Sequence, residues 1–259
     1  MEPPGLYALK EIVKYIKNDG KRLIALSVVP FHEGDLHLWV FKDFEKEFKK
    51  PFEKVLEKIK EIGNEEIVDI ALSKNCDLIV LSRKKNFSLM MKLLGVNVTR
   101  VIGYSPVDVL VIPQDSKLFF NKILVPMDGS IYSEVAFKKA CKIAQKFSSE
   151  LHLLSVVDTL VEISVQNPDL VEGLYNTAKN ILGKVQNTAE SLGIKTKIHI
   201  REGDPGEKIL TFIEEREIET VVMGSYGKTG IKRLLMGSVA EKVLTFTSIP
   251  VLISKSLEF

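Results

Sequence analysis

The second half of the chain combines two hydrophobic patterns. Short apolar runs that end in turn residues, such as residues 122–126, are typical of buried strands. Apolar residues within 131–147 instead recur with helical spacing. Together the patterns predict strands at 122–126, 151–157, 195–201, 219–223 and 249–253, and helices at 131–147, 168–192, 205–216 and 238–246. This alternation indicates an α/β fold with parallel strands, in which ligands bind at the carboxyl ends of the strands.

An internal repeat relates the two halves of the chain. A first alignment of the chain with itself places 23–29 on 151–157, where most positions match. A second alignment, with a slightly larger offset, places 77–81 on 219–223, Gly95 on Gly237 and Val109-Leu110 on Val251-Leu252. We therefore predict two related domains, residues 1–115 and 117–259, joined at the polar, proline-marked segment around 113–116.

The first half is the shorter copy. It has strands predicted at 22–28, 77–82 and 107–112 and a helix at 65–74, but nothing matches the strands 122–126 and 195–201. A stretch with aromatic residues at helical spacing lies between, at Phe31, Trp39, Phe41, Phe44, Phe48 and Phe52. Packing in the core or between domains is the expected role of these aromatic residues, and a ligand-stacking platform is the alternative.

Charge and composition exclude several classes of function. The 36 basic and 34 acidic residues nearly cancel and are interspersed, so no electrostatic case exists for binding nucleic acid or anionic lipid. Cys76 and Cys141 are too few for a disulfide framework and lack metal-ligand spacing, so each is expected to be a small buried hydrophobe. The first residues do not resemble a signal peptide, and no apolar run reaches the roughly 18–20 residues of a membrane span. A cytoplasmic location is expected.

Three loops at strand ends carry unusual residues. Residues 126–130 follow one predicted strand, residues 224–230 follow another, and 237–239 open the last helix. Gly224 and Gly227 lack a Cβ, so their amides could approach an anion closely and could adopt positive φ. A helix N-terminus adds free amides and a partial positive charge.

Charged side chains in these loops fit the same chemistry. Lys228, Lys232 and Arg233 add positive charge near the glycines. Asp128 could accept hydrogen bonds from ribose hydroxyls or hold a divalent metal that is bound to phosphates. The loops therefore predict a phosphate site with a carboxylate opposite.

Each feature also has a purely structural interpretation. The glycines could simply make a turn, Ser238 and Glu241 could form a capping box, and Asp128 could cap helix 131–147. A Walker A loop is excluded, because the glycine that it requires five residues before Gly227 is replaced by Val222.

The spacing of Gly224, Gly227 and Gly237-Ser238 resembles the G-x2-G-x9-G-[ST] signature of the ATP-binding universal stress proteins. Residues 123–130 resemble the first strand and acidic residue of that family, and 203–205 resemble the turn before its third helix. The resemblance covers 119–255 and extends weakly over 8–113. It implies two tandem Rossmann-like (adenine nucleotide alpha hydrolase-like) domains, the first reduced.

The resemblance also implies a ligand and the residues that bind it. The ligand would be ATP or AMP, with or without Mg²⁺, and Asp128 would face the ribose and the metal. Val156 would hold adenine through its backbone, and Gly227, Gly237, Ser238 and Val239 would cradle the phosphates. The complete set of implied binding residues is Pro126, Met127, Asp128, Val156, Met223, Gly224, Gly227, Gly237, Ser238 and Val239.

Sheet order and assembly follow from the same resemblance. The family's strand order, 3-2-1-4-5, would bring Asp128 and Gly224 to one crevice. Its members dimerise through their final strands, so 107–112 could pair with 249–253 as an intramolecular pseudo-dimer, with a homodimer left open. In the first half Ser82, Lys85 and Val96 replace Gly224, Gly227 and Ser238, so no ATP is expected there.

Three functions remain to be separated. The first is a nucleotide-binding regulatory protein of the stress response, whose nucleotide changes the surface shown to an unidentified protein partner. The second is slow ATP hydrolysis or adenylyl transfer. It is disfavoured because the histidines, at 32, 37, 152 and 199, lie on predicted strands or in the first half and provide no evident base. The third is an interaction scaffold that binds no nucleotide.

Overall fold

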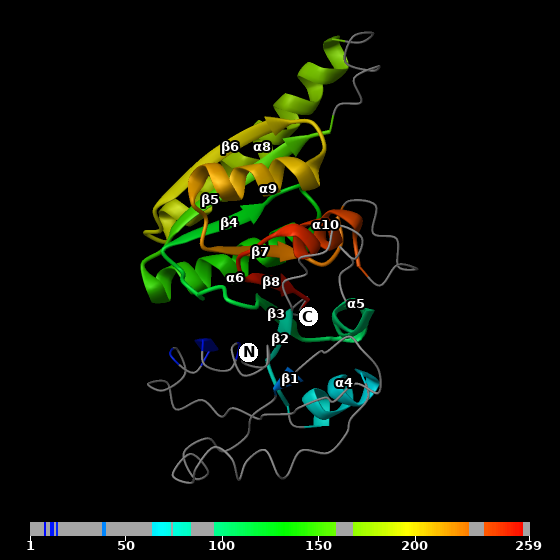
Figure 1. Ribbon diagram of the computed structural model, residues 1–259. Helices are drawn as coiled ribbons and strands as arrows, with labels where there is room; N and C mark the ends of the chain where they lie inside the picture. Colours follow the sequence, from blue (N-terminus) through cyan, green and yellow to red (C-terminus); the bar gives the residue numbers. More distant parts are fainter. Residues whose placement is uncertain are drawn as a thin grey trace.

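One mixed sheet runs through the whole molecule in the computed structural model (Figure 1). The structure describes residues 8, 11–12, 14, 38–39, 64–73, 75–83, 96–158, 168–227 and 236–255. Its strands are β1 (Leu38–Trp39), β2 (Leu78–Arg83), β3 (Asp108–Pro113), β4 (Lys122–Pro126), β5 (Glu150–Val157), β6 (Thr196–Glu202), β7 (Thr220–Gly224) and β8 (Val251–Ser254). Its helices include α4 (Asn64–Ser73), α5 (Val96–Tyr104), α6 (Ile131–Phe147), α8 (Pro168–Ser191), α9 (Pro205–Arg216) and α10 (Ser238–Phe246). The fold is α/β and Rossmann-like, as the alternation of patterns predicted.

The second half has the strand order that the resemblance implied. Its strands lie in the order β6-β5-β4-β7-β8, which is 3-2-1-4-5 when they are numbered along the chain, and all neighbouring pairs among them are parallel. The order reverses at β4 and β7. Parallel sheets bind ligands at the carboxyl side of such a reversal, so the fold places the ends of these two strands where a ligand site is expected.

The two halves are joined by strand pairing. β3 lies antiparallel to β8, with Val109 opposite Ile253, Leu110 opposite Leu252 and Val111 opposite Val251. The expected pairing of the last strands is therefore confirmed. Leu110 and Leu252 are equivalent in the second alignment of the repeat, so a local pseudo-two-fold axis passes through this pair.

The register of the strands confirms the duplication. The second alignment carries the pair Ile79–Val109 of β2 and β3 onto the pair Val221–Val251 of β7 and β8. It also carries α5 onto α10 from the first residue to the last. The weak matches along the sequence thus correspond to equivalent positions in space.

The first half differs from the second at its outer edge. β1 pairs antiparallel with β2, on the side of β2 that corresponds to the place of β4 beside β7. A strand that runs in the opposite direction therefore lies beside β2 at the place that β4 takes beside β7. Trp39 lies in this strand rather than on a helix. The strand predicted at 22–28 and the aromatic residues other than Trp39 lie outside the described residues.

Each face of the sheet carries one core that crosses both halves. On one face α4 and α5 of the first half and α9 and α10 of the second contribute to a single apolar cluster, which includes Ile67, Val101, Phe212 and Val243. On the other face α6 and α8 pack over the sheet together with Ala8 and Ile12. Cys141 belongs to this second core, and burial raises the pKa of its thiol to about 11. None of the described helices has both the length and the hydrophobicity required to cross a membrane.

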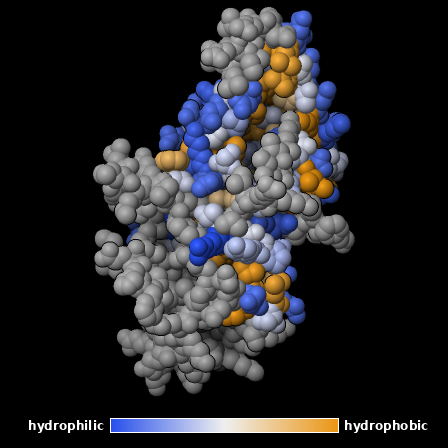
Figure 2. Space-filling view, turned by 90° about the vertical axis from the view of Figure 1, so that its right-hand side faces the viewer, coloured by the Kyte–Doolittle hydropathy of each residue, from blue (hydrophilic) through white to orange (hydrophobic). Residues whose placement is uncertain are grey.

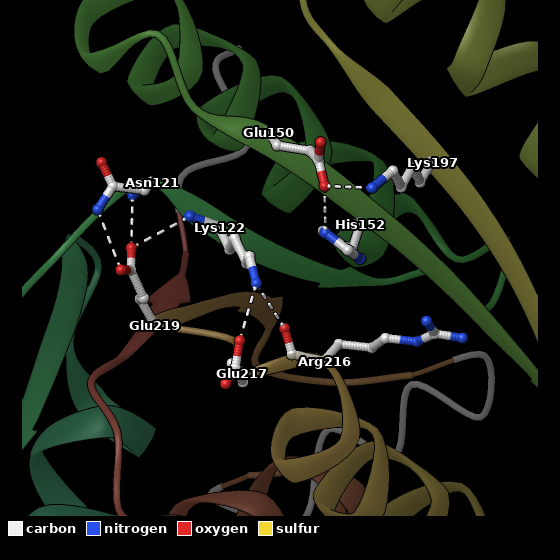
Figure 3. A network of polar contacts seen from close by, with 8 residues as sticks. All are labelled: Asn121, Lys122, Glu150, His152, Lys197, Arg216, Glu217 and Glu219. Atoms are coloured by element: carbon white, nitrogen blue, oxygen red, sulfur yellow. Dashed lines mark hydrogen bonds and ion pairs between the residues drawn. The ribbon is translucent and has the colours of Figure 1, made fainter.

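Polar contacts hold the strands together at the amino end of the sheet, opposite the carboxyl ends of β4 and β7 (Figure 3). The carboxylate of Glu219 accepts hydrogen bonds from the backbone and side-chain amides of Asn121, at 2.6 and 3.0 Å. The ammonium of Lys122 lies 3.2 Å from the carbonyl of Arg216 and 3.3 Å from a carboxylate oxygen of Glu217. These contacts bind β4 to β7 and to the end of α9.

A histidine pair lies beside this network. His152 bonds to Glu150 at 2.8 Å, and its ring stacks on that of His199, with the centroids 5.3 Å apart. The ring of Phe212 lies against both. Burial and the neighbouring His152 lower the pKa of His199 to about 4, and burial lowers that of His152 as well. The bond to Lys195 lowers the pKa of Glu150 to about 2, so this carboxylate stays charged beside the neutral rings.

The histidine pair predicts a pH dependence of stability. The unfolded chain, with a histidine pKa of 6.5, takes up a proton before the folded protein does. Stability from this pair is therefore complete above pH 6.5 and decreases as the pH falls toward about 4. We expect the melting temperature of the wild type to rise between about pH 5 and pH 6.5, and we expect a smaller rise in His199→Phe, which keeps a ring against Phe212. Equal slopes for the two proteins would contradict this assignment.

Candidate functional site

The end of β4 leads into a tight turn that orients Asp128. The Oδ1 atom of Asp128 accepts a hydrogen bond from the amide of Ser130 at 2.9 Å, and Gly129 between them has φ +79°. Ser130 is the N-cap of α6, because its hydroxyl accepts from the amide of Ser133 at 3.1 Å. The interpretation of Asp128 as the N-cap of this helix is therefore wrong. Its role in the turn fixes the carboxylate at the carboxyl end of β4.

Gly227 lies directly against that carboxylate. A Cβ built on Gly227 would be 2.9 Å from Oδ2 of Asp128. The loop after β7 and the turn after β4 therefore converge, as neighbouring strands at a reversal point allow. The absence of a side chain at position 227 lets the backbone of the loop lie close to the carboxylate.

Gly224 is required for a different reason from the one expected. A Cβ there would lie 2.7 Å from Cβ of Tyr132 and 2.8 Å from its carbonyl carbon, so this glycine lets β7 approach the first turn of α6. Positive φ is not what the loop demands, because the described glycines with positive φ are Gly129, Gly193 and Gly203. Gly224 and Gly227 do not use the positive φ that a glycine can adopt, and the constraint at both positions is space.

The N-terminus of α10 packs on the same loop. Gly237 is the N-cap, and its amide donates to the carbonyl of Ser225 at 2.8 Å. Ser238 is the first helical residue and is exposed, so the capping box of Ser238 with Glu241 is not formed. A Cβ at Gly237 would lie 3.3 Å from the backbone of Ser225 and of Tyr226. The glycines at 227 and 237 thus bring the loop, the helix start and the carboxylate of Asp128 together.

The apolar members of the proposed set differ in what they can offer. The side chain of Met127 is buried in the core on the α6 face, and its amide donates to the carbonyl of Leu154 at 2.8 Å. Met223 is also buried, in the core on the α9 and α10 face. Val156 and Val239 are half-buried and pack at the border of that same core. Pro126, half-buried, lies beside Leu154 in the sheet. Val156 and Val239 could present apolar surface to a ligand, whereas Met127 and Met223 could present backbone.

Tyr132, Tyr226 and Lys255 lie together at this loop, although the sequence analysis did not single them out. The rings of Tyr132 and Tyr226 lie 5.4 Å apart, and the ammonium of Lys255 lies 5.6 Å from the ring of Tyr226. Burial lowers the pKa of Lys255 to about 8. These contacts join three segments that are distant in the chain, so pattern reasoning could not find them. Lys228, Lys232 and Arg233, which the sequence offered as the nearby cations, lie outside the described residues.

The arrangement suits a phosphate group, whose oxygen atoms can also serve as metal ligands. The start of α10 packs on the loop through Gly237, and the carboxylate of Asp128 lies against Gly227 of the same loop. The described residues contain no group of three or more histidines, cysteines or acidic residues able to hold a metal. A metal at Asp128 could complete its oxygen ligands from water and from a bound phosphate. In Figure 1 β4 and β7 point to the right, and Figure 2 shows the molecule from that side. Polar surface lies in the middle of this view, with apolar patches above and below it.

The matching position in the first half is built differently. Ser82, the counterpart of Gly224, is buried at 1% exposure, and its hydroxyl has no hydrogen-bond partner in the described part of the chain. Arg83 follows and points across to α10. Lys85 and Gly95, the counterparts of Gly227 and Gly237, lie outside the described residues.

Comparison with known proteins gives a family match in both halves of the chain. The model of the universal stress protein family matches the chain twice, over residues 2–113 and 119–255. Universal stress protein MJ0531 of Methanocaldococcus jannaschii is 36% identical over 140 residues, which cover 52% of this chain and 82% of that protein. MJ0577 of the same organism is 31% identical over 156 residues, which cover 53% of this chain and 96% of that protein.

Solved structures extend the comparison to both halves. The structure of MJ0577 covers 55% of this chain and all of its own, with a TM-score of 0.51 and 33% identity. A universal stress protein from Archaeoglobus fulgidus covers 96% of this chain and 91% of its own, with a TM-score of 0.60 and 21% identity. The second likeness concerns the fold alone and spans the tandem arrangement.

The two loop glycines predict unequal effects of the same substitution. Gly224→Ala should lower the free energy of unfolding by about 2 kcal/mol, because its Cβ meets the backbone of α6, which cannot move freely. Gly227→Ala should cost less than about 1 kcal/mol, because its Cβ meets the end of a side chain that can turn away. Denaturant unfolding of both variants measures the difference. A larger loss for Gly227→Ala would overturn the steric assignment.

Proposed function

Because this chain belongs to the universal stress protein family, we propose that its second half binds an adenine nucleotide, ATP or AMP, at the ends of β4 and β7 and acts as a nucleotide-dependent regulatory protein. The single observation that carries the proposal is the close approach of Gly227 to the carboxylate of Asp128, at 2.9 Å for a Cβ on the glycine. The proposal treats residues 117–259 as the nucleotide domain and 1–115 as a related domain without a nucleotide.

The proposed roles follow the positions of the residues. Asp128 accepts from the ribose hydroxyls and, when Mg²⁺ accompanies ATP, lies toward the metal. The backbone at Gly227 and the start of α10 at Gly237, Ser238 and Val239 hold the phosphates, since a helix N-terminus favours anions. Adenine lies against Val156, with the backbone at Pro126, Met127, Met223 and Gly224 closing the pocket. Binding would change the surface that a protein partner meets.

The positions of the histidines, which are the candidate general bases, favour a regulatory role over hydrolysis. His152 lies near the amino end of β5, beside the contacts of Figure 3, whereas Asp128 follows the carboxyl end of β4. His199 stacks on His152, and the pKa of each is lowered by burial. In the described part of the site no other histidine accompanies the carboxylate. Incubation with ATP followed by product analysis tests this, and we expect no more ADP than from Asp128→Ala.

Asp128→Asn isolates the charge of the carboxylate. The amide oxygen of asparagine can still accept from Ser130, so the turn is retained while the negative charge is lost. We expect the wild type to bind ATP in the micromolar range and the variant to bind MgATP about tenfold more weakly, since one charge-assisted contact contributes about 1.5 kcal/mol. Calorimetric titration with ATP and AMP, with and without Mg²⁺, measures this.

The matched control is Glu150→Gln, which removes a carboxylate at the amino end of the sheet. It should bind nucleotide as the wild type does. If the wild type bound neither nucleotide under any of these conditions, the chain would be an interaction scaffold and the proposal would be wrong. An unchanged affinity in Asp128→Asn would leave a nucleotide site but remove Asp128 from it.

A further inference from the structure

Arg83 links the first half of the chain to the helix that opens the candidate phosphate site. It is the last residue of β2, and its guanidinium reaches across to the second half. Nη1 donates to the carbonyl of Thr245 at 3.0 Å, and Nη2 donates to the carbonyl of Thr247. The guanidinium is largely buried, and burial lowers its pKa, but an arginine remains charged in such a setting. Two charge-assisted hydrogen bonds therefore connect the halves at this point.

The acceptors belong to the C-terminal end of α10. Thr245 lies in its last turn, and Thr247 is its C-cap. Carbonyls at a helix C-terminus lack partners within the helix and carry a partial negative charge, so a cation there is stabilising. The last turn of α10, all of it described, contains no basic residue of its own. Arg83 supplies that cation from the other half of the chain.

The opposite end of α10 lies at the loop after β7. Gly237 donates to the carbonyl of Ser225 and packs against Tyr226, as described above. The helix has nine residues and so spans about 14 Å. Its apolar face, at Ala240, Val243 and Leu244, is buried in the core. A rod this short and this well packed transmits a displacement of one end to the other.

The internal repeat relates this contact of Arg83 to a contact of the second half. The second alignment places Arg83 on Ser225, because β2 and β7 have equivalent registers. The same strand-end position therefore contacts α10 in both halves. Ser225 accepts from its N-terminus, and Arg83 donates to its C-terminus. At the strand end where the second half has its glycine loop, the first half has Arg83, which contacts the C-terminus of α10, the helix after that loop.

We propose that Arg83 is a positioning residue for nucleotide binding: it fixes the C-terminus of α10 so that the N-terminal amides of the helix are held in place for the phosphates. The inference rests on the proposed function and assigns a role to the half that lacks the glycine pattern. The first half is then part of the binding machinery through this contact, without binding a nucleotide itself. In place of a second nucleotide site, the first half contributes the contact between the end of β2 and the end of α10.

Removal of the guanidinium tests the proposal. Arg83→Met keeps an apolar stem and loses both hydrogen bonds. We expect it to bind ATP about fivefold more weakly than the wild type at a temperature well below unfolding, a value at the low end of coupling between sites. Amide hydrogen exchange of residues 238–247 without nucleotide should be faster in the variant. Arg201→Met is the matched control, because Arg201 also joins a strand to a helix, through Glu215 of α9, and does not contact α10 in the described structure.

The possible outcomes separate this inference from the proposed function. A wild type that binds no nucleotide refutes the function and the inference with it. A wild type that binds, with Arg83→Met of lower melting temperature but equal affinity, refutes the inference alone and makes Arg83 a structural contact. Should Arg83→Met fail to fold, the wild type decides: because coupling is reciprocal, ATP should slow exchange of the amides at 243–247, and unchanged exchange there overturns the proposal.

Discussion

Three antiparallel residue pairs between β3 and β8 join the two halves of this protein into one sheet. Without that pairing both strands would be open edges, which expose backbone donors and acceptors to other chains. The pairing also decides which helices meet. Because β3 and β8 are antiparallel and related by a local two-fold axis, α4 and α5 lie on the same face as α9 and α10, and one apolar cluster spans all four. The contact of Arg83 with the end of α10 exists because this pairing fixes the halves in register.

Space, rather than backbone conformation, is the common requirement at the glycines of the candidate site. Gly224 admits the backbone of α6, Gly227 admits the carboxylate of Asp128, and Gly237 admits the loop before it. The glycine pattern therefore records three close approaches: Gly224 to α6, Gly227 to the turn after β4, and Gly237 to the loop before α10. Because each glycine allows a different close approach, the spacing of the three is not explained by one simple turn. This difference also separates the pattern into a part that packs against α6, at 224, and a part that lies against a carboxylate, at 227.

The sequence predicted the second half closely because its elements follow local rules. Helices 131–147, 205–216 and 238–246 have the limits that their hydrophobic spacing indicated, and Asp204 with Pro205 begins α9 as such residues do. The errors concern tertiary contacts. β1 could not be foreseen, since a two-residue strand is defined by its partner β2. The cap at Gly237 replaced the Ser238 capping box because its amide bonds to the loop, and no local signal reveals the position of Lys255 beside Tyr226.

The two halves have kept the same framework under different constraints. Identical registers in β2–β3 and β7–β8 show that the pairing surface is the same in both copies, since a slip of one residue would turn every buried side chain outward. The strand ends are free of that constraint, because their residues face loops. Gly224 and Ser225 in one copy correspond to Ser82 and Arg83 in the other. The side chain of Ser82 is buried, and the arginine after it turns toward the second half. The strand end of the first half thus carries a serine and an arginine, and the arginine supplies a cation to the C-terminus of α10.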